Sequence, residues 1–260
     1  MSNMKKWRVC GATICILLAM MLSVGCANNQ DNGSVVSYCA KEETDENRIY
    51  FNYPQLQDDV DDADEINALI VDFVKFTLQD LQAGDGFAGN LWDSYERYDW
   101  NNNDYTSCAI DMDYEVMRND ANYLSVVFEG LCNYKFAAHP TDRFFAVTID
   151  RRSNVVVGID DLYRVEDDFI KAFQSDDHIR AGFAKKFSTP LEGFSDTFIE
   201  DVWGFSGIGD LENFLSPDEG YRTPFFLTEE AVGISVTMPF AMGDHFEVLV
   251  DCDELQPFEK

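Results

Sequence analysis

Two long segments with alternating apolar residues, separated by Asn119-Asp120-Ala121-Asn122, constrain the fold of this chain most. Alternation at every second residue is typical of a strand with one buried face, and a short polar segment between two such strands favours a hairpin. We therefore expect an antiparallel hairpin whose inward residues are Cys108, Ile110, Met112, Tyr114 and Val116 on the first strand, and Leu124, Val126, Phe128, Gly130 and Cys132 on the second.

The register of this hairpin determines which cysteines lie opposite each other. Centring the turn on Asp120 places Cys108 directly opposite Cys132, within reach of a cross-strand disulfide. Outside the first 26 residues the chain has two more cysteines, Cys39 and Cys252, an even total that suits an oxidising compartment. We expect a Cys108–Cys132 disulfide and a Cys39–Cys252 disulfide that ties the two ends of the domain.

The rest of the chain contributes more strands and a few grouped helices. Grouped rather than alternating elements indicate an α+β fold: an antiparallel sheet with long hairpins, and helices packed on one face. The expected elements are a strand over 48–54 that ends at Pro54, a helix that begins near Asp62 and ends at Gly84, a hairpin over 144–159, helices over 166–174 and 176–187, and strands over 224–237 and 246–251.

The N-terminus has the pattern of an export signal. Lys5, Lys6 and Arg8 precede an apolar run over 9–25, with no acidic residue before Cys26. We interpret residues 1–25 as a lipoprotein-type signal peptide, 26–46 as a polar tether and 47–260 as one α+β extracytoplasmic domain. The chain is then extracytoplasmic and anchored to the cell membrane by a lipid on Cys26.

The residues before Cys26 depart from the usual lipobox. Leu22-Ser23-Val24-Gly25 has Ser23 where a large aliphatic residue normally stands, three positions before the cysteine. Two alternatives to lipidation of Cys26 therefore stay open: ordinary cleavage of the signal nearby, or an uncleaved apolar anchor.

Net charge limits the partners of the domain. The whole chain carries −29, and without the three basic residues of the signal 16 Lys and Arg stand against 48 Asp and Glu, a net charge of −32. Such a surface repels nucleic acid and anionic lipid and attracts cationic partners. The same charge also keeps a protein soluble, so it does not name a partner by itself.

The sequence contains no complete catalytic or metal-binding motif. It has three histidines, no His-Glu-x-x-His and no Cys-x-x-Cys. The segment 204–208 lacks the second glycine of a nucleophile elbow, and 99–110 lacks the turn glycine and the final glutamate of a calcium loop. We expect no enzyme activity, no cofactor and no metal.

Most of residues 47–257 resemble a family of extracytoplasmic domains shared by the lysozyme-sensing anti-sigma factor RsiV and the N-terminal region of the peptidoglycan deacetylase PdaC. The matching segments are 49–54, 66–67, 123–128, 137–139, 147–150, 159–163, 225–228, 239–243 and 253–255. The chain has Ala137-Ala138-His139 where the family typically has Gly-Ala-His, and 188–222 has no counterpart. Since only eight residues precede the apolar run, the resemblance implies neither a sigma-binding segment nor a deacetylase domain.

The resemblance and the charge together suggest a function. The resemblance implies the fold and the location in the cell envelope. With the charge, it leads us to expect a non-catalytic binding module whose partner is an envelope protein, such as a cationic lysozyme-like protein, or peptidoglycan. His139 is the candidate ligand contact, although a histidine at a sheet end also serves to hydrogen-bond the backbone. Two alternatives are a glycan-acting or metal-assisted enzyme with an unrecognised site, and a purely structural envelope lipoprotein.

Overall fold

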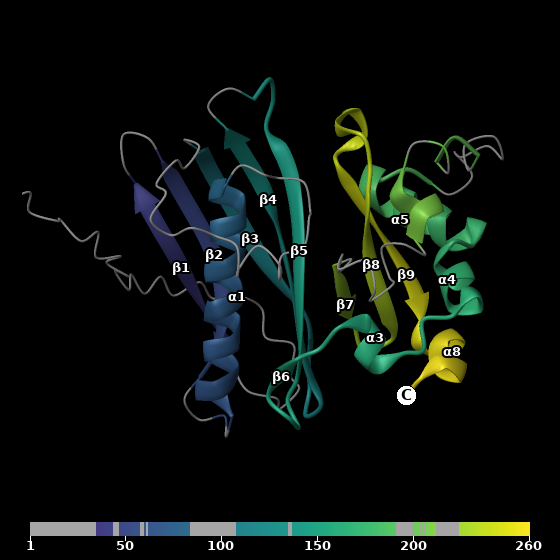
Figure 1. Ribbon diagram of the computed structural model, residues 1–260, viewed down its shortest axis with the longest axis horizontal. Helices are drawn as coiled ribbons and strands as arrows, with labels where there is room; N and C mark the ends of the chain where they lie inside the picture. The colour runs from purple at the N-terminus through teal and green to yellow at the C-terminus, as the bar shows by residue number, and fades with distance from the viewer. Residues whose placement is uncertain are drawn as a thin grey trace, which may run out of the picture.

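The computed structural model describes residues 35–43, 47–57, 60, 62–83, 108–134, 137–190, 200–202, 204, 206–211 and 224–260. Two sheets lie side by side, and each has helices on its outer side (Figure 1). This arrangement confirms the predicted α+β class. No helix within the described ranges has the length and apolar character needed to cross a membrane.

The larger sheet has six strands, which follow one another in chain order. All neighbours are antiparallel except β2 and β3, which run parallel. The strands are β1 (Val35–Glu43), β2 (Arg48–Leu56), β3 (Cys108–Asn119), β4 (Tyr123–Tyr134), β5 (Thr141–Asp150) and β6 (Val155–Val156).

One long helix, α1 (Ala63–Ala83), covers one face of this sheet. Its stripe of Ile66, Ile70, Val74 and Leu81 is almost completely buried, as helical spacing predicts. These residues pack against alternate residues of β2–β5, including Phe51, Met112 and Phe128, in one hydrophobic core.

The smaller sheet and its helices form a second core. The sheet consists of β7 (Phe225–Leu227), β8 (Ala231–Thr237) and β9 (His245–Asp251), all antiparallel. The remaining residues of this core come largely from four α-helices and three 3-10 helices. These are α3 (Ile159–Leu162), α4 (Asp167–Phe173), α5 (Asp176–Phe187), α8 (Cys252–Leu255), η2 (Gly207–Asp210), η4 (Phe240–Met242) and η5 (Gln256–Phe258). The single predicted strand over 224–237 is therefore two strands.

The two sheets are joined through polar as well as aromatic contacts. Ser125 of β4 is buried, and its Oγ lies 2.9 Å from Thr148 Oγ1 of β5 and accepts a hydrogen bond of 2.9 Å from the backbone N–H of Leu227. Phe144 of β5 contacts Phe226 of β7, with ring centroids 5.9 Å apart. Strands β4 and β5 are therefore covered on both faces, by α1 on one side and by the second sheet on the other.

The predicted hairpin is present, but its register was wrong by two residues. Cys108 lies opposite Tyr134, and Cys132 lies opposite Ile110. The turn closes where Asp120 N donates to Tyr123 O, and a bulge between Val116 and Arg118 adds a further shift.

The cysteine predictions fail with the register. Cys108 and Cys132 are both buried in the core under α1, whereas Cys39 lies on β1 and Cys252 begins α8 in the other core. All four are free thiols, so neither the Cys108–Cys132 nor the Cys39–Cys252 disulfide is formed.

Two further boundaries need correction. Residues 35–43 of the predicted tether form β1, the edge strand of the large sheet. Pro54 does not end its strand, because β2 continues to Leu56. Its partner across the ladder is Ser37 of this edge strand.

Candidate functional site

The helices of the smaller sheet carry a concentration of exposed carboxylates. Acidic side chains occupy the first turns of α3, α4, α5 and α8, where they are favoured by the helix dipole. We call this surface the acidic helical face. Its exposed members are Asp161, Glu166, Asp167, Asp168, Asp176, Asp177, Asp251, Asp253, Glu254 and Glu259.

These helix starts share one side of the molecule. His178 Nε2 of α5 lies 3.6 Å from Glu254 Oε2 of α8, and Lys260 N donates to the carbonyl of Leu162 in α3. Figure 1 shows α4, α5 and α8 on the outer side of the smaller sheet and α3 below the lower end of this sheet. The carboxylates of these helix starts therefore form one continuous acidic surface rather than isolated charges.

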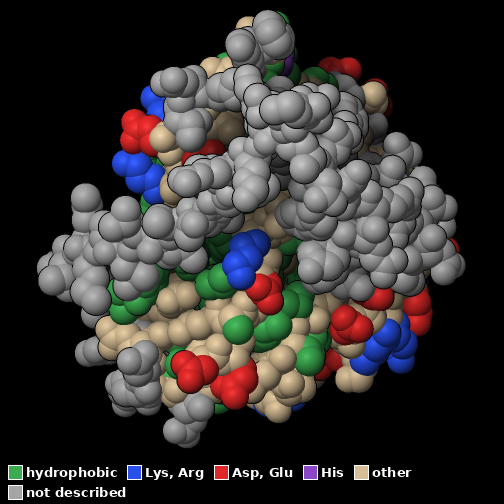
Figure 2. Space-filling model, turned by 60° about the vertical axis from the view of Figure 1, so that its left-hand side comes forward, with side chains coloured by type: hydrophobic (Ala, Val, Ile, Leu, Met, Phe, Trp, Pro, Cys, Tyr) green, Lys and Arg blue, Asp and Glu red, His purple; other side chains and the backbone are tan. Residues whose placement is uncertain are grey.

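Most basic side chains of the described ranges are already used within the protein. Figure 2 shows one face on which the blue Lys and Arg side chains lie beside red Asp and Glu. The ion pairs are Lys41–Glu43, Lys75–Asp72, Arg118–Asp120, Arg151–Asp62, Arg152–Asp150, Arg164–Glu166, Lys171–Asp168 and Lys186–Asp142.

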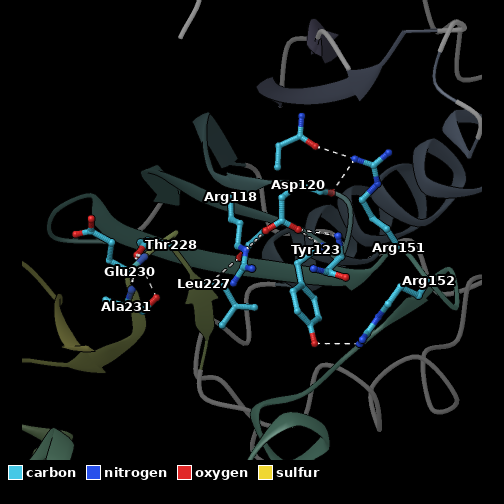
Figure 3. Close-up of polar contacts among 12 residues, drawn as sticks. Arg118, Asp120, Tyr123, Arg151, Arg152, Leu227, Thr228, Glu230 and Ala231 are labelled. Carbon is cyan, nitrogen blue, oxygen red and sulfur yellow. Dashed lines mark hydrogen bonds and ion pairs between the residues drawn. The ribbon is translucent and has the colours of Figure 1, made fainter. Parts of the chain in front are cut away.

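The largest group of arginines holds the hairpin turns together (Figure 3). Arg151 donates to Asp62 Oδ1 (2.9 Å), at the start of α1, and to the carbonyl of Asp120 (3.0 Å). Arg118 and Arg152 lie over the ring of Tyr123, at 5.1 and 5.4 Å from its centroid. Because these guanidinium groups are occupied by carboxylates, carbonyls and an aromatic ring, we assign this end a structural role.

A second polar cluster lies between the two sheets at their opposite end. Its centre is His245, the first residue of β9, which is 5% exposed. Gly243 and Asp244, both with positive φ, form the turn before it. Asp244 Oδ2 accepts a hydrogen bond of 2.7 Å from Asp142 N, which fixes this turn to the start of β5.

Charged groups surround the imidazole of His245. Its Nδ1 lies 2.7 Å from Glu247 Oε1, and its Nε2 lies 3.4 Å from Asp142 Oδ2 and 3.8 Å from Glu129 Oε1. Lys186 Nζ, from the last turn of α5, lies 3.3 Å from the same Asp142 oxygen. Burial lowers the pKa of His245, but the carboxylates of Asp142 and Glu247 outweigh it and raise the pKa to about 9. The imidazole is therefore buried at the centre of a cluster of charges whose outer member, Glu129, reaches solvent.

The residue singled out from the sequence, His139, is not part of this buried cluster. It is exposed, its ring stacks on Phe240, and its Nδ1 lies 3.2 Å from the carbonyl oxygen of Pro140. These contacts fit the backbone-bonding role at a sheet end. The elbow-like segment contains Ser206, whose hydroxyl donates to the carbonyl of Val202. Cys26 and the calcium-like segment 99–107 lie outside the described residues.

The His245 cluster has only a weak signal in the sequence. His245 and Glu247 are two residues apart on one strand, so both point to the same face. Glu129, Asp142 and Lys186 are distant in sequence, and only the packing of the two sheets brings them to the same place.

The comparisons with known proteins show the fold alone. No protein-family model matches this chain, and no curated protein does. A DUF3298 family protein from Pseudomonas aeruginosa PAO1 is similar in structure, with a TM-score of 0.50 at 12% identity, over 88% of this chain and 95% of that chain. A DUF3298 member from Bacteroides fragilis NCTC 9343 gives a TM-score of 0.48 at 14% identity, over 89% of this chain and 96% of that one. The chain therefore has a fold similar to that of a DUF3298 family protein.

Proposed function

We propose that this chain is a non-catalytic binding module of the cell envelope, and that its acidic helical face binds a cationic lysozyme-like protein. The observation that carries the proposal is the concentration of exposed carboxylates on the helix starts of α3, α4, α5 and α8. Opposite charges steer association and orient the partner, even where they add little to the final affinity. The resemblance of the sequence to a lysozyme-sensing domain agrees with this choice of partner.

The acidic helical face can be tested with two variants of equal net charge. Four exposed carboxylates are neutralised in each, either on the acidic helical face or elsewhere. The first variant is Asp167→Asn, Asp177→Asn, Asp253→Asn and Glu259→Gln; the control is Asp64→Asn, Asp111→Asn, Asp113→Asn and Glu115→Gln, on α1 and β3.

Binding is measured by titration of the purified protein with a basic lysozyme, beside another basic protein of similar charge. Exposed ion pairs contribute about 0.3–0.5 kcal/mol each, so four should change Kd roughly tenfold in the first variant and much less in the control. Binding should also weaken with salt, because the Debye length falls from about 10 Å at 0.1 M to 3 Å at 1 M. Equal binding of both basic proteins would refute a lysozyme-specific partner, and equal loss in both variants would refute the assigned face.

We also propose that Cys26 carries the lipid that holds the chain at the outer side of the membrane. Small residues before this cysteine and the polar residues after it support the proposal. Metabolic labelling with a fatty-acid analogue should mark the parent chain and not a Cys26→Ser variant. Equal labelling of both would place the lipid elsewhere, and no labelling of the parent would favour ordinary cleavage or an uncleaved anchor.

A peptidoglycan fragment is the other partner to test. If it saturates the protein while lysozyme does not, the acidic helical face is not the binding surface and the module recognises glycan instead.

A further inference from the structure

Three potential metal-ligand atoms meet at the end of the inter-sheet layer. Glu129 of β4, Asp142 of β5 and His245 of β9 each present one donor atom, and all three atoms lie within 4.8 Å of one another. His245 Nε2 is 3.4 Å from Asp142 Oδ2 and 3.8 Å from Glu129 Oε1. In a tetrahedral zinc site with bonds of about 2.0–2.1 Å, ligand atoms are about 3.3–3.5 Å apart. The two distances from Nε2 match or slightly exceed this spacing, and the third side of the triangle is within 4.8 Å.

The imidazole is oriented as in a metal site. Its Nδ1 is paired with Glu247 Oε1 at 2.7 Å, which leaves Nε2 directed toward Asp142 and Glu129. Ligating histidines usually hold their second nitrogen on a carboxylate in this way, since that bond fixes the ring and its tautomer. Nε2 itself is buried and has no hydrogen-bond partner of acceptable geometry. A buried ring nitrogen that faces two carboxylates without forming a hydrogen bond is a position where a metal ion can replace the ring proton.

Lys186 is the present counter-ion of the carboxylates. Its Nζ lies 3.3 Å from Asp142 Oδ2 and 3.8 Å from Glu129 Oε1. The absence of a side chain on Gly243 leaves room for its stem, because a Cβ there would lie 3.2 Å from Lys186 Cε. The lysine therefore occupies the position in which a metal cation would be attracted, and the two cations compete for the same oxygens.

From this geometry we propose a divalent transition-metal site, with Zn²⁺ as the preferred ion, formed by Glu129, Asp142 and His245. The nitrogen ligand selects against Ca²⁺ and Mg²⁺, which take oxygen ligands. Glu129 is 54% exposed on its side chain, so the ion enters from solvent and keeps a fourth position for water or an incoming ligand. Bound there, the ion joins β4 and β5 of the large sheet to β9 of the small one and displaces Lys186.

The test is a Zn²⁺ titration of the chelator-treated, purified protein by calorimetry, with the thermal midpoint as a second readout. We expect one saturable site in the parent chain, at least tenfold weaker binding in His245→Asn and Glu129→Gln, and no change in the control His178→Asn. Lys186→Met removes the competing cation and should bind Zn²⁺ more tightly than the parent. That gain of affinity can only be observed in a folded protein, so it separates loss of a ligand from loss of the fold.

Zinc bound by cysteine thiolates elsewhere in the chain is the alternative explanation that must be excluded. Cobalt(II) serves as a spectroscopic probe, because thiolate ligands give intense charge-transfer bands that nitrogen and oxygen ligands do not. Thiolate bands, unaltered binding in His245→Asn, or weaker binding in Lys186→Met would each overturn the proposal. Lysozyme binding is measured separately, and neither result depends on the other.

Discussion

Replacement of Ser125 by alanine tests whether the two sheets are held together by one buried hydroxyl. Ser125 Oγ is the acceptor for the backbone N–H of Leu227 and the partner of Thr148 Oγ1, both at 2.9 Å. Backbone N–H groups alternate in direction along a strand. The N–H of Thr228 is bonded to Ala231 O at the start of β8, so the N–H of Leu227 points away from β8. Without the serine hydroxyl, this buried N–H loses its acceptor.

The size of the effect follows from these two bonds. An unpaired buried N–H costs about 1–3 kcal/mol, and the lost bond to Thr148 a further 0.5–1.5 kcal/mol or so. Ser125→Ala should therefore lower the free energy of unfolding by about 2–4 kcal/mol. For a domain of this size that corresponds to a Tm roughly 4–16 °C lower. Thr148→Val removes only the second bond and should cost about 0.5–1.5 kcal/mol.

Urea denaturation followed by circular dichroism measures both variants, with exposed Ser153→Ala as the matched control. In a double-mutant cycle the two changes should be non-additive, because the residues share a bond. A Ser125→Ala change within 0.5 kcal/mol of the parent, or a larger cost for Thr148→Val, would refute the role of this hydroxyl.

Three further measurements test other parts of the structure. Gly182→Ala places a Cβ 2.4 Å from the carbonyl oxygen of Glu247, so α5 must move away from β9. The free energy of unfolding in urea should fall by about 1–3 kcal/mol, and an unchanged midpoint would contradict this packing. Burial raises the pKa of Cys132 to about 12, so its thiol should react with a maleimide only on unfolding, and rapid labelling of the native protein would be inconsistent with that burial. Burial raises the pKa of Asp120, but the backbone N–H groups of Tyr123 and Asn122 and the Arg118 side chain outweigh it and lower the pKa. The contribution of Asp120 to stability is therefore present above the unfolded pKa near 3.9 and is lost as the pH falls through the folded pKa. Asp120→Asn should make stability less dependent on pH below about pH 4, and an unchanged dependence would exclude the effect.

The parts of the fold that sequence reasoning found are those with a single buried face. The stripe of α1 and the inward residues of β3 follow from periodicity, because one side of each element faces the core and the other faces solvent. Helices α4 and α5 were also placed nearly to the residue, since Ser175 accepts the N–H of His178 and marks the start of α5.

The hairpin register could not be predicted in the same way. A shift by two residues keeps every side chain on the same face, so the alternation of Cys108, Ile110 and Met112 is equally compatible with both registers. The choice depends on local geometry, namely the closing pair Asp120 and Tyr123 and the bulge before Arg118. The predicted Cys108–Cys132 disulfide depended on the wrong register and was therefore wrong as well.

The candidate metal site was missed for a different reason. Ser125, Thr148, His245 and Glu247 all lie on strand faces that alternation assigns to solvent, and three of them are in fact buried between the sheets. A polar residue on an outward face gives no sign that a second sheet will cover it. Once it is covered, its donors and acceptors must find partners, so buried polar groups collect in this layer.

This difference in burial also explains why the two proposed functions lie in different parts of the molecule. Carboxylates on the helix starts of α4, α5 and α8 stay hydrated and act at a distance, so they suit the attraction of a large cationic partner. Asp142 and Glu247 are partly buried between the sheets and act over a few ångströms, so they require a cation in contact, which Lys186 supplies at 3.3 Å from Asp142. We therefore propose that the same acidic composition supports long-range attraction on the helices and a selective cation site between the sheets.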